Sequence, residues 1–138
     1  MPGSIFRWYI HRQVERLGHT SDDVAVRAES RLILFGKMAI PQVLQVVDHP
    51  DPRVRFRAVW VLGRSRDPAV FEAVLSHVED SDHRVAYDAM MALGQLGDSR
   101  AIPYLKLLAI KFDGHPEGLG GAALSALSKL GVELESDE

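Results

Sequence analysis

The amino-acid sequence predicts an all-α fold in which pairs of helices stack side by side into a right-handed superhelix of about eight helices. Three observations support this fold class. Apolar residues recur at the 3.6-residue period of an amphipathic helix, as in Val54, Ala58 and Leu62. No stretch of useful length alternates apolar and polar residues with the period of two that is typical of a strand. The same helical pattern also returns about every 31 residues, which is the signature of a solenoid.

The repeat is clearest in the middle of the chain, where "RVRFRAVWVLGRSRD" is followed by "HRVAYDAMMALGQLGD". Five matching residues lie 31 positions apart: Val54, Ala58, Leu62, Gly63 and Asp67 precede Val85, Ala89, Leu93, Gly94 and Asp98. An earlier copy places Val24 and Ala28 thirty positions before their counterparts. A fainter copy near the C-terminus places Leu119 and Ala123 thirty-four positions after theirs. Each copy therefore reads as two helices joined by a turn.

The repeat divides one domain, residues 1–138, into consecutive units. We expect an N-terminal capping helix at 5–18, repeats near 21–48, 51–79 and 82–111, a terminal half-repeat at 116–130 and an acidic tail at 132–138. The predicted helices after the cap lie near 22–35, 38–48, 52–65, 68–79, 83–96, 99–111 and 117–130. On the capping helix we expect Ile5, Phe6, Tyr9, Ile10, Val14 and Leu17 to share one buried face.

Turn residues support these boundaries. Asp51 is suited to cap a helix that begins with Pro52, and Asp82 holds the same place one repeat later. Gly97 suits the left-handed conformation that ends a helix, and Asp98 can cap the helix that follows.

Composition excludes several classes of protein. The chain has 138 residues, a net charge of -3 and no cysteine, so a disulfide or a thiolate zinc site is impossible. The net charge gives no reason to expect binding to nucleic acid or to an anionic membrane. No apolar run approaches the roughly 20 residues that span a bilayer. We therefore expect a soluble cytoplasmic protein.

The pattern V-R-x-x-A-x-x-x-L-G-x-x-x-D-x-x-A-V/I-P resembles the short HEAT-like repeat of phycobilisome lyases, a bacterial and archaeal relative of the eukaryotic HEAT and armadillo repeats. The resemblance covers about residues 21–130, although Ala86 stands where the pattern has Arg. It implies a bacterial or archaeal protein in which the helix with V-R-x-x-A lines the concave side. The helix with "AIP" would lie on the convex side.

The outward positions of the two middle concave helices carry aromatic residues, Met and Arg, which are the residue types enriched at protein interfaces. The predicted partner-binding residues are Arg53, Phe56, Arg57, Trp60, Arg64, Arg84, Tyr87, Asp88 and Met91. Arginine beside aromatic rings suits an acidic peptide or protein as the partner. A second copy of this chain, bound through the same surface, is also a possible partner under this prediction. The alternative is that Phe56 and Trp60 pack between neighbouring repeats.

The same repeat resembles deoxyhypusine hydroxylase, in which His-Glu pairs directly after V-R on the concave helices bind two irons. The pairs at these positions are Val26-Arg27, Phe56-Arg57, Tyr87-Asp88 and Gly121-Ala122. No His-Glu pair occurs in the sequence, and no HExxH motif places two histidines for zinc. We therefore predict no metal, no cofactor and no catalytic residue.

These observations together predict a non-catalytic module or adaptor that binds a peptide or protein on its concave face. One alternative is a subunit of a phycobilin lyase-like or other chromophore-handling enzyme. A lesser alternative is nucleic-acid binding. The sequence disfavours it because Asp22, Asp23, Asp88 and Glu117 share the predicted surface with the arginines.

Overall fold

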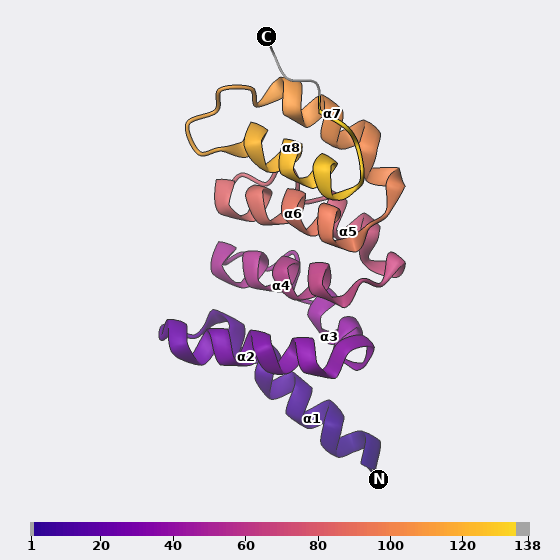
Figure 1. The fold of residues 1–138 in the computed structure, drawn as a ribbon. Helices are drawn as coiled ribbons and strands as arrows, with labels where there is room; N and C mark the ends of the chain where they lie inside the picture. The colour runs from indigo at the N-terminus through magenta and orange to yellow at the C-terminus, as the bar shows by residue number, and fades with distance from the viewer. Residues whose placement is uncertain (1, 135–138) are drawn as a thin grey trace.

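The computed structural model describes residues 2–134, and within them it contains helices and turns but no strand. The α-helices of this range are α1 (Pro2–Glu15), α2 (Asp22–Phe35), α3 (Ile40–Leu44), α4 (Pro52–Ser65), α5 (Phe71–Leu75), α6 (His83–Leu96), α7 (Ile102–Lys111) and α8 (Leu119–Lys129). Figure 1 shows them stacked along one axis. The predicted all-α class is confirmed. Residues 135–138 of the predicted acidic tail lie outside the described residues.

The four helices α2, α4, α6 and α8 lie side by side, α4 packing against α6 and α6 against α8 (Figure 1). Two glycines allow the last two pairs to approach closely. A Cβ on Gly63 would lie 2.6 Å from the Cβ of Ala92, and one on Gly94 would lie 2.9 Å from the Cα of Ala126. The glycine spacing seen in the sequence therefore reflects backbone contact between successive repeats.

The second helix of each of the first two repeats is shorter than predicted. In place of single helices at 38–48 and 68–79, α3 and α5 have five residues each. They follow 3-10 turns at Gly36–Met38 and Pro68–Val70. After α3 the backbone N–H groups of Val46 and His49 donate to carbonyls three residues back, which tightens the helix into turns.

Aspartate caps begin the segments as predicted. The side chains of Asp51, Asp82 and Asp98 each accept the N–H two residues ahead, at 2.9 Å. Gly97 ends α6 in the left-handed conformation with φ 71°. These aspartates therefore mark the starts of α4, α6 and the 3-10 turn before α7, whereas α2 and α8 begin without a side-chain cap.

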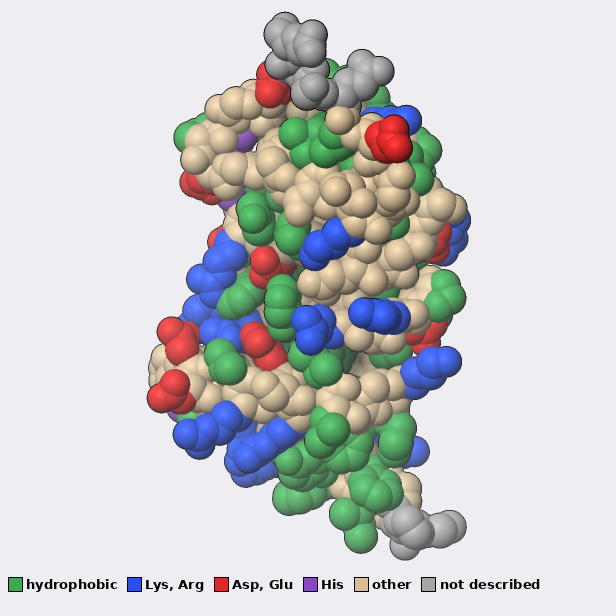
Figure 2. All heavy atoms as spheres, viewed as in Figure 1, with side chains coloured by type: hydrophobic (Ala, Val, Ile, Leu, Met, Phe, Trp, Pro, Cys, Tyr) green, Lys and Arg blue, Asp and Glu red, His purple; other side chains and the backbone are tan. Residues whose placement is uncertain are grey.

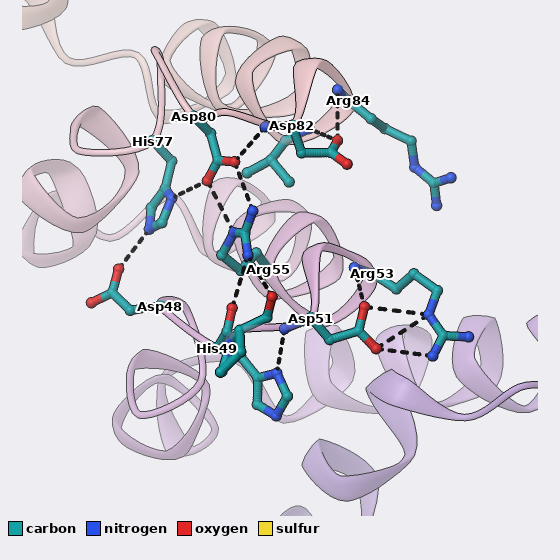
Figure 3. A network of polar contacts seen from close by, with 11 residues as sticks. Asp48, His49, Asp51, Arg53, Arg55, His77, Asp80, Asp82 and Arg84 are labelled. Carbon is teal, nitrogen blue, oxygen red and sulfur yellow. Dashed lines mark hydrogen bonds and ion pairs between the residues drawn. The ribbon is translucent and has the colours of Figure 1, made fainter.

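A buried polar network joins the turns of neighbouring repeats (Figure 3). Arg55 donates from Nε and Nη2 to the two oxygens of Asp80 at 3.0 and 2.9 Å, and His77 bridges Asp80 and Asp48 at 3.0 and 2.9 Å. Asp80 also accepts the N–H of Asp82 at 2.9 Å. Burial favours a raised pKa for Asp80, but its hydrogen bonds from Arg55, Asp82 and His77 lower that pKa to about 2.

The N-terminal helix differs from the prediction. It begins at Pro2 and ends at Glu15, with a 3-10 turn at Arg16–Gly18, instead of running from 5 to 18. Ile10 and Leu17 are buried, whereas Ile5 is 66% exposed and Phe6 43% exposed. Ile5 and Phe6 therefore do not share the buried face, because α1 runs diagonally past the edge of α2 and its first turns extend beyond the stack (Figure 1). No helix among residues 2–134 combines the length and the apolar character needed to cross a membrane.

Candidate functional site

The outward side of α2, α4, α6 and α8, which we call the long-helix face, carries the residues predicted to bind a partner. At its centre, the ring of Phe56 lies between two guanidinium groups. The Cζ atom of Arg84 is 3.5 Å from the ring centroid and that of Arg57 is 4.8 Å away. Phe56 is half-buried and also packs against the core. This residue of α4 therefore joins its own helix to α6 while one side remains at the surface.

Arg57 is buried and is held by two carboxylates from α2. Its Nη1 donates to Glu29 at 2.8 Å and its Nη2 to Asp22 at 3.1 Å. Burial raises the pKa of Glu29, and the hydrogen bond and charge of Arg57 oppose that rise. The charge of Arg57 is thus neutralised within the chain, and its guanidinium is not open to an incoming acidic group.

Sequence reasoning missed Glu29, although the repeat contained a signal for it. Glu29 occupies the position at which the next two repeats place Val59 and Met90, both fully buried. A carboxylate at a core position of a repeat predicts a buried partner of opposite charge. Arg57, on the adjacent helix, is that partner.

Asp88 on α6 is half-buried, and within residues 2–134 its carboxylate has no hydrogen bond or ion pair. Burial raises its pKa to about 6; the charge of Arg84 lowers the pKa, and that of Glu29 raises it further. Three carboxylates, those of Asp22, Glu29 and Asp88, here accompany the two guanidinium groups of Arg57 and Arg84. At the centre of the long-helix face the carboxylates therefore outnumber the guanidinium groups by one, which leaves a net negative charge when all five groups are ionised.

The other predicted residues are spread along the same face. Trp60 is half-buried with Arg64 over its ring at 5.7 Å, and Met91 is half-buried against the core. Tyr87 is 39% exposed, and Arg53 is exposed and paired with Asp51 at 2.9 Å. The structure thus brings Phe56, Arg57 and Arg84 into contact, and separately Trp60 and Arg64. Their role in binding a partner stays a prediction.

Stacked pairs of helices with a repeating sequence of about 31 residues define a helical-repeat solenoid protein. The HEAT repeat family matches residues 14–85 and again 40–114 of the sequence, which together make up most of the chain. The chain belongs to the HEAT repeat family.

Two plant proteins and one solved structure that resemble this chain are deoxyhypusine hydroxylases. Deoxyhypusine hydroxylase-B of Oryza sativa subsp. japonica is 38% identical over 79 residues, which are 57% of this chain and 26% of the rice protein. Deoxyhypusine hydroxylase of Arabidopsis thaliana is 32% identical over 102 residues, 67% of this chain and 32% of that protein. The structure of human deoxyhypusine hydroxylase in complex with glycerol superposes with a TM-score of 0.66 at 19% identity, over 96% of this chain and 50% of that one. The chain therefore spans a third or less of the plant relatives and half of the human structure.

These relatives contradict the prediction of a non-catalytic adaptor, because the two plant proteins that match its sequence at 38% and 32% identity are hydroxylases. They come from plants and human, so they give no support to a bacterial or archaeal origin or to the phycobilisome lyase type of repeat. HEAT-like repeats occur in adaptors, in hydroxylases and in phycobilisome lyases, so the repeat pattern alone could not separate these three classes of protein.

The residues of this chain do not fit the paired irons that the resemblance to the hydroxylase implies. Of the four positions that would carry His-Glu pairs, Asp88 alone has a ligating side chain, and it is flanked by Tyr87. Within the part of the chain that the structure describes, no group of three or more His, Cys, Asp or Glu residues could hold a metal ion. We therefore derive no step that depends on iron bound by these residues.

Proposed function

We propose that this chain serves a hydroxylase related to deoxyhypusine hydroxylase by binding the cationic side chain of a protein substrate on its long-helix face. Deoxyhypusine is a lysine lengthened by an aminobutyl group, so its two amines are protonated at neutral pH. The sequence relationship to the plant enzymes supports the substrate class. In this proposal the chain binds the substrate and does not supply the iron site, since no group of its described residues could hold a metal ion.

The observation that carries this proposal is the unpaired carboxylate of Asp88. Burial raises the pKa of this half-buried carboxylate, and the charge of Arg84 offsets only part of that rise. A bound ammonium group supplies that charge and returns the pKa of Asp88 toward its ordinary value. The exposed ring of Tyr87, which lies beside Asp88 in the sequence, offers an apolar surface to the methylene groups of a long amine.

The neighbouring arginines do not prevent this binding. Arg57 is neutralised by Glu29 and Asp22, and Arg84 lies over the ring of Phe56. The three carboxylates and two guanidinium groups together leave one negative charge, which one of the two ammonium groups of the bound side chain would balance.

The test is a comparison of three synthetic peptides that differ at one residue: deoxyhypusine, lysine or acetyl-lysine. Binding to the whole chain is measured by isothermal titration calorimetry. We expect the deoxyhypusine peptide to bind most tightly and Asp88→Asn to weaken it about tenfold, the value of one charge-assisted hydrogen bond. Affinity should also fall as the pH drops below about 6, because Asp88 then takes up a proton.

The matched control is Asp23→Asn, which removes an exposed carboxylate from the start of α2 and should leave binding unchanged. Equal binding of the three peptides, or wild-type affinity in Asp88→Asn, would show that the proposal is wrong. We also expect no oxygen incorporation into the peptide when ferrous iron is added to the chain alone, as followed by mass spectrometry. Turnover under that condition would show that the chain holds its own metal and is more than a substrate-binding part.

A further inference from the structure

A second site lies at the C-terminal ends of the long helices, about two turns beyond Asp88 along α6. A pocket of about 580 Å³ opens where α4, α6 and α8 end, a volume within the range of small-molecule sites. Its lining includes Gly63 and Gly94, the two glycines at which α4 approaches α6 and α6 approaches α8. The other lining residues used below are Arg64, Arg66, Gln95 and Lys129.

The repeat itself builds the rim of this pocket. Arg64, Gln95 and Lys129 each stand two residues after the equivalent leucines Leu62, Leu93 and Leu127, so they form a row across three successive helices. Figure 2 shows basic side chains gathered over the right-hand end of α4 and just above it. Within residues 2–134, none of Arg64, Arg66 and Lys129 is in an ion pair.

Arg66 reaches the pocket from a strained backbone position. Its φ is 53°, in the left-handed region, whereas the next two repeats place Gly97 and Gly131 at the same position with φ 71° and 84°. A residue other than glycine costs roughly 1–2 kcal/mol in this conformation. Strain of this kind concentrates at ligand sites. The second repeat therefore carries a cation at the position where the next two repeats have glycine, which adopts this conformation without strain.

Neutralisation of the helix ends does not account for the three cations. A helix C-terminus carries about half an elementary negative charge, so three of them offset only about 1.5 of the three positive charges. The middle helix, α6, has no basic residue in its last turn. A positive excess remains at the pocket.

Gln95 contributes an unpaired hydrogen-bond acceptor to the pocket. Its Oε1 atom is buried and has no hydrogen-bond partner among the described residues. A buried acceptor without a donor is costly, and a ligand that brings an O–H or N–H group would satisfy it.

We propose that this pocket binds a small phosphate ester whose carbon portion carries a hydroxyl or N–H group. A tetrahedral phosphate directs its oxygens toward cations on different sides, as Arg64, Arg66 and Lys129 are placed on two helices and a turn. A carboxylate, in contrast, is planar and is best matched by the edge of one guanidinium group. The ester's donor group pairs with Oε1 of Gln95. This site is separate from Asp88 and independent of the function proposed above.

The experiment titrates the whole chain with ribose phosphate, inorganic phosphate, citrate and ribose, and follows amide chemical shifts by NMR. We expect ribose phosphate to bind most tightly, inorganic phosphate and citrate more weakly, and ribose not at all. Arg66→Gly and Lys129→Gln should each weaken ribose phosphate about tenfold. Gln95→Met should remove the preference for ribose phosphate over inorganic phosphate.

Controls separate this site from general charge attraction. Lys106→Gln removes an equivalent exposed charge on α7 and should bind as the wild type does. If Lys106→Gln weakened ribose phosphate binding equally, or if Arg66→Gly had no effect on it, the phosphate would be an adventitious ion only. Tighter binding of an RNA oligonucleotide than of ribose phosphate, at equal phosphate concentration, would also overturn the proposal. Arg66→Gly restores the residue of the neighbouring repeats, so its melting temperature should stay close to the wild type. Asp88→Asn should leave ribose phosphate binding unchanged, which lets the two proposals fail separately.

Discussion

Asp80 is the centre of the network that joins the second and third repeats, and its charge can be removed by Asp80→Asn with little change of shape. The side chain is 7% exposed and meets Arg55, His77 and the N–H of Asp82. Its pKa falls from 3.8 to about 2, nearly two pH units at about 1.4 kcal/mol each. The charge therefore stabilises the fold by roughly 2–3 kcal/mol at neutral pH. That is a sizeable part of the roughly 7–20 kcal/mol expected for a domain of this size.

The assay is urea unfolding followed by circular dichroism across a range of pH. The pKa of Asp80 is lower in the folded state than in the unfolded chain, so its stabilisation is complete above about pH 4 and is lost as the pH falls toward about 2. The difference in unfolding free energy between wild type and Asp80→Asn should be constant near neutral pH and should close over that acid range.

The control for this prediction is Asp51→Asn, which removes the charge from the surface pair with Arg53 and leaves a side chain that caps α4 equally well. It should have little effect. The reasoning is refuted if Asp80→Asn is as mild as Asp51→Asn, or if the stability difference persists unchanged at pH values below about 2.

Two further predictions concern stability. Asp88→Asn should stabilise the fold by roughly 1 kcal/mol at pH 7 after allowing for solvent screening, because burial raises the pKa of Asp88. This gain should grow as the pH rises from about 4 to about 6 and should be absent in acid, and urea unfolding would measure it. Gly63→Ala should destabilise by about 1–3 kcal/mol because its Cβ would lie 2.6 Å from that of Ala92, whereas Gly121→Ala, with open space around it in α8, should stabilise by up to about 1 kcal/mol. Thermal unfolding compares the two glycine variants, and equal shifts in melting temperature would contradict this explanation.

The sequence was a good guide to features that depend on a residue and its near neighbours along the chain. The caps at Asp51 and Asp82 and the helix end at Gly97 are local, and each was predicted correctly. The shortness of α3 and α5 could not be predicted, because apolar periodicity is similar for an α-helix and for successive tight turns.

The candidate site was harder to predict because it depends on contacts between repeats. Helical periodicity placed Arg57 and Asp88 on one outward face, but it does not say which side chain from the adjacent helix lies opposite. Glu29 buries Arg57, whereas Asp88, at the matching position one repeat later, has no partner among the described residues. The class of the relatives was harder to predict for a related reason: aromatic and arginine residues are common to interfaces and to substrate-binding surfaces, so composition did not separate these two kinds of surface.

The close glycine contacts have a mechanical consequence for the solenoid. Backbone contact at Gly63 and Gly94 leaves little freedom for α4, α6 and α8 to slide or tilt. The first repeat has Ile33 at the same position, and its junction with α4 is instead held by the ion pairs of Arg57. The stack is therefore stiff toward the C-terminal end and more compliant at one seam. Bending should therefore concentrate between α2 and α4.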